Sequence, residues 1–238
     1  VRIRVSAGTS VPLGDGQITV TSPLGTATSP LSVVDQSTFA IEADTRLLWH
    51  LDESANGAVP LLDAGTLSID GLDYSASASV DARFGRGRRT ALATSDNDYG
   101  QLAFSTGSFT VETWMKTGPM PAGVSYQLVG RGGSYYDSAS YEYSLQLDAA
   151  GNLTAKIYPT TGSVVQAVMP ATAYDVDNDA WHSVAMVVNR ATAKLQLYVD
   201  GIERTTVDIP AGFGTMRATA TNRLFLGGRV GVNAQYPF

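Results

Sequence analysis

A run of acidic side chains in the second half of the chain has a spacing that could hold a metal ion. Asp175, Asp177 and Asp179 alternate along the sequence, as the first three ligands of an EF-hand calcium loop do. That loop needs glycine at position six and a bidentate glutamate at position twelve, but the chain has Ala180 and Met186 there. The sequence therefore excludes an EF-hand, and we interpret the run as a solvated acidic loop.

Two histidines, His50 and His182, are the side chains that could act as general bases in serine hydrolysis. Both lie in stretches with strand character, so each is expected to be packed by its neighbours. The chain has no Gly-x-Ser-x-Gly nucleophile motif, and we predict no histidine-based hydrolase. Cysteine is absent, which excludes disulfides, thiol catalysis and thiolate metal sites.

Four tyrosines lie close together in the sequence, at Tyr135, Tyr136, Tyr141 and Tyr143. An aromatic ring that carries a hydroxyl can stack on a sugar or contact a protein surface. These four residues are therefore the candidate ligand-binding site. The alternative is that alternating tyrosines in a strand are half-buried packing residues.

Four arginines, Arg83, Arg86, Arg88 and Arg89, form the one basic cluster of the sequence. They could grip a phosphate or another polyanion, or they could pair with the surplus acidic residues nearby. The segment Gly85-Arg-Gly-Arg-Arg-Thr90 begins like a dinucleotide-binding motif but lacks the third glycine, so a dinucleotide site is excluded.

The charge balance argues against two classes of partner. Acidic residues outnumber Lys and Arg by 22 to 16, for a formal net charge of −6. Nucleic acids and anionic membranes are repelled by such a charge at long range, and neither is predicted as a partner. No apolar run approaches the roughly 18 residues of a membrane span, so no membrane insertion is predicted. Charged residues are only 16% of the chain, which predicts a largely neutral, hydroxyl-rich surface.

Apolar and polar side chains alternate with a period of two along most of the chain. Leu195 and Leu197 alternate with Gln196 and Tyr198, and the Asp200-Gly201 pair that follows is typical of a hairpin turn. The pattern predicts an all-β fold, a two-sheet antiparallel sandwich without a convincing helix. Strands are predicted near residues 46–52, 90–94, 99–104, 108–116, 125–131, 141–148, 152–158, 163–168, 181–189, 194–200, 203–208 and 222–228.

Three sequence blocks carry a resemblance to a known family. They are Ser108-Phe-Thr-Val-Glu-Thr-Trp114, Trp181-His-Ser-Val-Ala-Met-Val-Val188 and Leu195-Gln-Leu-Tyr-Val-Asp-Gly201. These blocks resemble the laminin-G-like jelly roll of the concanavalin A-like superfamily, in its bacterial form. Similar blocks extend the resemblance over about residues 41 to 236. It implies a jelly-roll sandwich with Trp49, Trp114 and Trp181 in the core.

Residues 1–40 differ in their residue pattern from the rest of the chain. They resemble the C-terminal part of an IPT/TIG-type immunoglobulin-like module, with two strands around the Pro23-Leu-Gly25 turn. We therefore predict two domains, this segment and a jelly roll over residues 41–238. The family normally adds a final strand with an Ile-Asp-Glu-Val-like motif, which is expected beyond Phe238. The N-terminus is expected to come from the interior of a longer precursor.

The family resemblance also implies a calcium site. Asp52, Asp63 and Asp98 match acidic positions of the family and are the candidate ligands, with backbone carbonyls completing the six to eight oxygens that calcium takes. Related glucanases carry a Glu-x-Asp-x-x-Glu strand that this chain lacks. Asp52-Glu53 and Glu112 do not supply paired carboxyls at alternate positions, so no enzymatic activity is predicted.

The sequence as a whole predicts a non-catalytic binding and adhesion module of a large exported bacterial protein, extracellular or at the cell surface. Its loops would contact a glycan or a protein. The alternative is a structural module of a surface or toxin protein, packed on neighbouring domains of its own parent chain and without a ligand. An open, polar, aromatic-bearing face would favour the first interpretation, and an exposed apolar patch the second.

Overall fold

The computed structural model describes residues 14–22, 25–33, 43–53, 59–73, 78–82, 86–89, 93–95, 100–121, 123–132, 141–217 and 222–227. These residues form sixteen strands with turns and extended segments between them, and they contain no helix. The predicted all-β fold is confirmed. The chain divides into two compact units, Val1–Ile41 and Glu42–Phe238.

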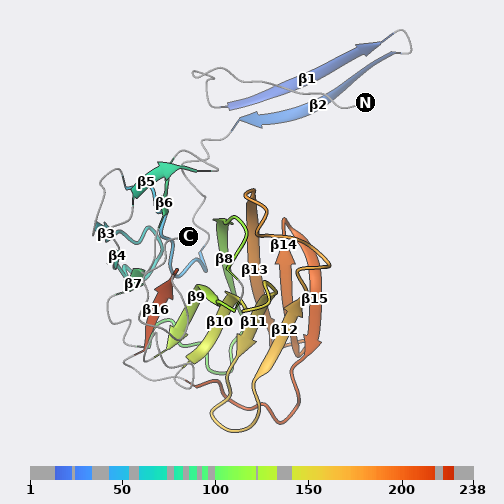
Figure 1. Ribbon diagram of the computed structural model, residues 1–238. Helices are drawn as coiled ribbons and strands as arrows, with labels where there is room; N and C mark the ends of the chain where they lie inside the picture. Colours follow the sequence, from blue (N-terminus) through green and yellow to red (C-terminus); the bar gives the residue numbers. More distant parts are fainter. Residues whose placement is uncertain are drawn as a thin grey trace. The chain divides into compact units, whose positions relative to one another are not determined.

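The described part of the first unit is a two-stranded ribbon (Figure 1). Strands β1 (Gly14–Ser22) and β2 (Gly25–Val33) pair antiparallel, from Gly14 opposite Val33 to Ser22 opposite Gly25. Such a ribbon is marginally stable at best by itself, because it has too little surface to bury. The immunoglobulin-like character of residues 1–40 stays a prediction.

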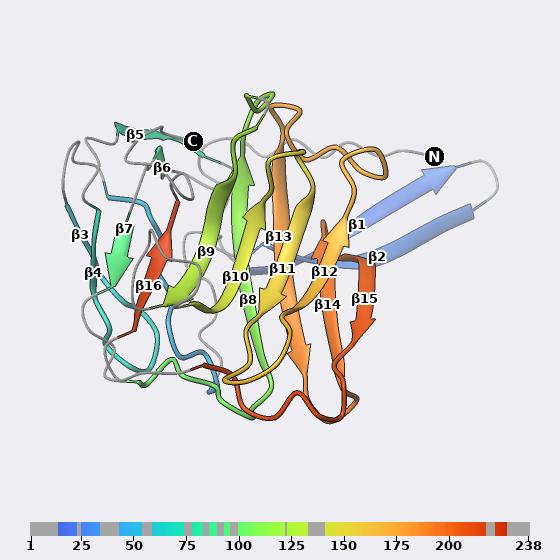
Figure 2. The same ribbon diagram turned by 60° about the horizontal axis from the view of Figure 1, so that its bottom comes forward.

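The second unit contains an eight-stranded antiparallel sheet (Figures 1 and 2). In spatial order its strands are β12 (Val165–Met169), β11 (Leu153–Ile157), β10 (Tyr141–Leu147), β9 (Tyr126–Gly132), β16 (Arg223–Leu226), β7 (Ala93–Ser95), β4 (Gly71–Asp73) and β3 (Val59–Leu61). The long strands β9–β12 form one half of this sheet, and the short strands form the other.

A four-stranded antiparallel sheet faces β9–β12, and Figure 2 shows the two layers one behind the other. Its order is β15 (Ile202–Asp208), β14 (Lys194–Val199), β13 (Trp181–Asn189) and β8 (Phe109–Lys116), and β5 (Ala78–Asp81) pairs with β6 (Arg86–Arg89) in a separate hairpin. Asp200 and Gly201 join β14 to β15 with φ of 53° and 74°. Two positive φ values in a two-residue turn match the twist of the strands that the turn connects.

The hydrophobic core lies between these two layers. Leu145 and Ile157 on one sheet and Met186 and Leu197 on the other are all fully buried and belong to one apolar cluster. Along β13 and β14 every second residue is buried, whereas every residue of β9 and β10 is buried. The central strands of the large sheet are therefore covered on both faces.

Two predicted strands are not present as predicted. In the segment 46–52, pairing is limited to an isolated bridge between Trp49 and Asp63. Residues 100–102 form a turn, and no strand is present over 100–104, although apolar side chains of this segment are still buried. Leu102 inserts into the core, and the Phe104 ring stacks on Phe109 with 4.3 Å between the ring centroids. The short strands β3–β6 escaped prediction because three or four residues carry too little periodicity.

The core can be tested with a matched pair of isoleucines. Ile157 is fully buried and Ile202 is 56% exposed. We expect Ile157→Ala to lower the free energy of unfolding by about 2–5 kcal/mol, because it removes buried methyl groups and leaves a cavity. Ile202→Ala should change it by less than about 0.5 kcal/mol. Urea unfolding of both variants measures the difference, and equal effects would contradict the assigned core.

Candidate functional site

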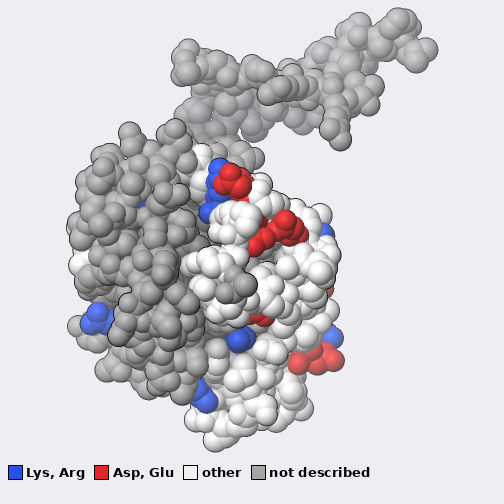
Figure 3. All heavy atoms as spheres, in the orientation of Figure 1, with Lys and Arg blue, Asp and Glu red and all other residues white. Residues whose placement is uncertain are grey.

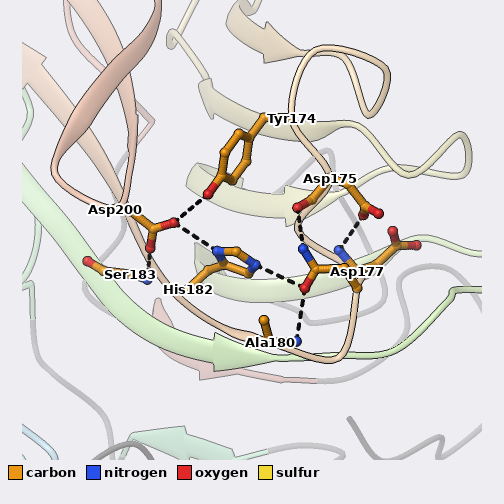
Figure 4. A network of polar contacts seen from close by, with 8 residues as sticks. Tyr174, Asp175, Asp177, Ala180, His182, Ser183 and Asp200 are labelled. Atoms are coloured by element: carbon orange, nitrogen blue, oxygen red, sulfur yellow. Dashed lines mark hydrogen bonds and ion pairs between the residues drawn. The ribbon is translucent and has the colours of Figure 1, made fainter. Parts of the chain in front are cut away.

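A polar network forms where the loop before β13 meets the turn between β14 and β15 (Figure 4). At its centre, His182 Nδ1 lies 2.9 Å from Asp200 Oδ2, and the Tyr174 hydroxyl donates to the same oxygen at 2.8 Å. The Ser183 N–H donates to Asp200 Oδ1 at 3.0 Å. We call Tyr174, Asn178, His182 and Asp200 the His182 network.

The other nitrogen of His182 is also occupied. Its Nε2 lies 3.2 Å from Asn178 Oδ1. Asn178 is held in this orientation because its Oδ1 accepts from the Ala180 N–H and its Nδ2 donates to the Asp175 carbonyl, both at 2.9 Å. The imidazole is buried, with 5% of the residue exposed. A general base needs a nitrogen that can reach a substrate, and this ring has both nitrogens engaged by the protein.

Hydrogen bonds shift the pKa values of two members of the His182 network, Asp200 and Tyr174. Burial acts to raise the pKa of Asp200, but the hydrogen bonds from His182, Tyr174 and the Ser183 N–H outweigh it and lower the pKa. The hydrogen bond to the Asp200 carboxylate raises the pKa of Tyr174, because losing its proton would place two negative charges together. The guanidinium of Arg204 covers the Tyr174 ring at 4.0 Å from the centroid.

The acidic loop supplies a carboxyl pair beside this network. A hydrogen bond between the side chains of Asp175 and Asp177 lowers the pKa of Asp175 and raises that of Asp177. The Asp177 carboxylate also accepts from the Met120 N–H at 3.1 Å. Glycosidases separate their two carboxyls by at least about 5 Å so that a sugar carbon or a water fits between them. The Asp177 N–H donates to Asp175 Oδ1 at 3.0 Å, so Asp175 closes a local turn of the loop.

The opposite end of β13 carries a second set of loop contacts, centred on Arg190. Its backbone N–H donates to Ser108 Oγ at 2.9 Å, its Nε donates to the Thr106 carbonyl at 3.3 Å, and its guanidinium donates to the Gly214 carbonyl. The guanidinium also lies over the Phe213 ring. Both ends of β13 thus use one polar side chain to join separate loops.

A buried ion pair joins the central strands of the large sheet. Arg131 on β9 and Glu142 on β10 are both fully buried and in direct contact, and Glu142 Oε1 also accepts from the Phe104 N–H at 3.0 Å. Burial raises the pKa of Glu142, although Arg131 opposes the shift. Sequence reasoning missed this pair, whose only local signal is a charged residue inside an otherwise strand-like run.

The candidate tyrosine site is only partly described. Tyr135 and Tyr136 lie outside the described residues. Tyr141 is fully buried and Tyr143 is 2% exposed. Tyr143 packs on the Phe109 ring, with 4.9 Å between the centroids. We therefore correct the sequence interpretation for Tyr141 and Tyr143, because a buried ring has no face on which a sugar can stack.

The candidate calcium ligands do not come together among the described residues. Asp63 Oδ1 accepts from the N–H groups of Leu48 and Gly65 at 2.9 and 2.6 Å, and its Oδ2 accepts from Ile69 at 2.9 Å. Asp52 is exposed, and Asp98 lies outside the described part. No group of three or more His, Cys, Asp or Glu forms there. Asp63 therefore holds a loop, and calcium stays a prediction.

The outer face of the four-stranded sheet carries another polar group. Gln196 Nε2 donates to Tyr198 Oη at 3.1 Å and to Glu203 Oε2 at 2.7 Å, and the Tyr198 hydroxyl donates to the same Glu203 oxygen at 3.1 Å. The hydrogen bond to Glu203 raises the pKa of Tyr198. We call these three residues the Tyr198 cluster. Sequence analysis assigned Gln196 and Tyr198 to one face but did not recognise them as a site.

Two of the three tryptophans also lie on this outer face. Trp114 and Ser183 are paired across β8 and β13, and Trp181 lies on the same side of β13, where it alternates with core residues. The prediction that both rings belong to the core is wrong. Trp49 does pack against the core, as predicted.

Charges are sparse on the face of the described surface that Figure 3 shows. In the view of Figure 3, acidic and basic atoms form small separate groups, and most of the described surface belongs to other residues. Two of the ion pairs are surface contacts, Lys116 with Asp179 at 3.4 Å and Lys194 with Asp208 at 2.5 Å. This agrees with the neutral surface predicted from composition.

A comparison with known protein families shows the superfamily to which the chain belongs. A laminin-G-type family model, described as the concanavalin A-like lectin/glucanases superfamily, matches residues 86–238. The chain belongs to this superfamily. A lectin and a glucanase on this fold differ in their sites, and the paired-carboxylate strand of the glucanases is absent from the sequence. No curated protein matches the chain.

Solved structures of the superfamily's fold include binding domains from bacteria. The binding domain of Paraclostridial Mosquitocidal Protein 1 has 14% identity and a TM-score of 0.51, over 71% of this chain and 45% of that one. The chain thus spans less than half of that structure. The Ruminococcus gnavus IT-sialidase CBM40 bound to α2,3 sialyllactose has 22% identity and a TM-score of 0.43, over 57% and 71%. Domain 4 of the Geobacillus stearothermophilus arabinanase AbnA, in complex with arabinotriose, has 16% identity and a TM-score of 0.45, over 68% of each chain.

The pKa shift of Asp200 predicts an acid-dependent loss of stability. A folded-state pKa below the unfolded value contributes stability above the unfolded pKa, near 4, and this contribution is lost as the pH falls through the folded value. We expect Asp200→Asn to lower the thermal midpoint at pH 7 and to have a smaller effect near pH 3. Asp208→Asn, which alters an exposed ion pair, is the control and should change little at either pH. A pH-independent effect of Asp200→Asn would contradict the assigned shift.

Asp63 provides a test of loop support against metal binding. Asp63→Asn puts an amide donor against the backbone N–H groups, so we expect it to lower the free energy of unfolding by about 1–3 kcal/mol. The loss should be the same with excess calcium and with a chelator. Asp52→Asn, at an exposed carboxylate, should have little effect. If calcium stabilised the wild type but not Asp63→Asn, the purely structural role would be wrong.

Proposed function

We propose that this chain is a non-catalytic binding module that presents a rigid surface to a glycan, within an extracellular or cell-surface multidomain protein. One observation carries the proposal. Both nitrogens of His182 are engaged, by Asp200 and by Asn178, so this candidate general base instead fixes the loop before β13.

Fixed loops favour binding for a physical reason. Association costs free energy for every loop and side chain that becomes ordered, and a surface that is already ordered avoids that cost. The His182 network and the contacts of Arg190 order loops at both ends of β13. A largely neutral surface with hydroxyl and amide groups suits an uncharged, polyhydroxylated ligand better than a charged one.

The contacts of the Asp175 and Asp200 carboxyl groups support the same proposal. The Asp175 carboxylate accepts from the Asp177 N–H, and the Asp200 carboxylate accepts from three donors. Neither arrangement offers a proton donor and a base on opposite sides of an open space, which glycoside hydrolysis requires. We therefore propose that the chain acts as a lectin, which binds a glycan, and not as a glucanase, which cleaves one. Among the described residues, no helix has the length and hydropathy needed to span a membrane.

A structural module packed on its own parent chain is the second candidate. The described ribbon of β1 and β2 favours it, because two strands alone bury too little surface to be stable. In the second unit, the large apolar side chains that are exposed among the described residues come from three separate segments, at Leu62, Val164 and Ile202. Three large exposed apolar side chains among the described residues are few for a surface that packs on a neighbouring domain, which favours a glycan ligand over a protein partner for this unit.

Binding and hydrolysis can be measured on the same samples. We expect the full chain to bind a subset of an immobilised glycan panel and to release no reducing sugar from soluble members of that panel. Heat-unfolded protein is the control for binding, and an active glucanase is the control for hydrolysis. Release of sugar would contradict the non-catalytic assignment, and binding no better than that of the unfolded control would contradict the glycan assignment.

A further inference from the structure

The outer face of the four-stranded sheet brings four side chains into one row across its strands. Glu112 on β8 pairs with Ala185 on β13, Ala185 pairs with Tyr198 on β14, and Tyr198 pairs with Glu203 on β15. Glu112, Ala185 and Tyr198 lie on the face turned away from the core, because they alternate with core-facing residues of their strands. Glu203 reaches the same face because the pairing of β14 and β15 shifts register between Leu197 and Tyr198. The backbones of the two glutamates are three strand spacings apart, about 14 Å.

From this row we infer that the outer face around the Tyr198 cluster is the glycan-binding surface of the chain, and that it takes a neutral oligosaccharide. The inference rests on the proposed function and goes beyond it in naming the site and the class of ligand. The inferred site is the outer face of a sheet, whereas the sequence analysis expected the loops to contact the ligand.

The row has the chemistry that a sugar ring needs. A pyranose has apolar C–H faces and a rim of hydroxyl groups, so it packs on an apolar floor and hydrogen-bonds at the margins. The Tyr198 ring and the methyl group of Ala185 provide the floor, because Ala185 is too small to cover the ring. Glu112 and Glu203 lie at the two ends, where their carboxylates can accept from hydroxyl groups.

The floor is also held in position before any ligand arrives. Gln196 and Tyr198 both hydrogen-bond to Glu203 Oε2, at 2.7 and 3.1 Å, so phenol, amide and carboxylate have fixed relative positions. The backbone beneath them is ordered by β13 and β15 on either side of β14. Rigid aromatic groups with few rotatable bonds lose little entropy on binding, which favours them as anchors.

The charge of this surface selects against anionic sugars. Glu112 and Glu203 are exposed carboxylates at both ends of the row. The basic side chains of β14 and β15 are engaged elsewhere, since Lys194 pairs with Asp208 at 2.5 Å and Arg204 lies over the Tyr174 ring. The two carboxylates would repel the negative charge of a sialic acid or sulfate group. This repulsion lowers the affinity for an anionic sugar more than the affinity for a neutral one.

The test compares neutral glycans with their acidic counterparts, lactose and 3′-sialyllactose being the simplest matched pair. With the full chain on a glycan array, we expect binding to neutral members of the panel and weaker binding to their sialylated forms. Tyr198→Ala should lower the affinity for the neutral ligand at least about tenfold, because it removes the floor. Tyr198→Phe keeps the ring and should lose less.

Two further variants complete the design. Gln166→Ala removes an exposed amide from β12 in the other sheet and should leave binding unchanged. Glu112→Lys places a cation at one end of the row and should raise the affinity for the sialylated ligand relative to the neutral one. Thermal midpoints of all variants should match that of the wild type, because the changes are on the surface.

The outcomes separate this inference from the proposed function. If the wild type binds glycans and Tyr198→Ala binds them equally well, the surface is wrong while the proposed function stands. If sialylated ligands bind better than neutral ones and Glu112→Lys changes nothing, the ligand class is overturned. If the wild type binds no glycan, the proposed function fails and this inference fails with it.

Discussion

The contact between the inner faces of the two sheets is the interaction on which the rest of this structure depends. Met186 on β13 and Leu197 on β14 are buried against β10 and β11, where Leu145 and Ile157 are buried in turn. Because side chains alternate along a strand, every inward residue sends its neighbour outward. The demand for a continuous apolar layer therefore also decides which side chains can reach solvent.

This constraint places the polar side chains in two kinds of position. Some lie at the ends of strands, where they join loops, as His182 does at the start of β13 and Arg190 after its end. Others lie on the outer face, where Gln196 and Tyr198 meet Glu203. The first kind gives the molecule rigidity, and the second kind gives it a chemically distinctive surface. Ordered loops together with a polar outer face fit the binding module that we propose.

The large sheet departs from this simple scheme. Its central strands β9 and β10 are buried on both faces, and the polar pair Arg131 and Glu142 is fully buried between them. An ion pair removed from water is expensive unless both partners are well hydrogen-bonded. Glu142 meets this condition in part through the Phe104 N–H, which ties the turn before β8 to the middle of the sheet. The pair thus links segments that lie far apart in the sequence.

Several features of the fold were determined by the sequence alone, because they depend on local periodicity. The alternation in the segments of β13 and β14 predicted these strands within a residue, and the Asp200-Gly201 turn was recognised from residue types that tolerate positive φ. The all-β class followed from many such segments. Family-like blocks pointed to the superfamily that the comparisons confirm over residues 86–238.

The tertiary structure alone decided what each polar or aromatic residue does. Alternation separates the two faces of a strand but does not say whether one face or both will be covered, so Tyr141 and Tyr143 were expected at a binding site and are buried instead. The partners of His182 and Asp63 come from other segments, and only the packing of sheets and loops brings them within hydrogen-bond distance. Periodicity is a property of neighbouring residues, whereas a site is made by residues that the fold brings together from a distance.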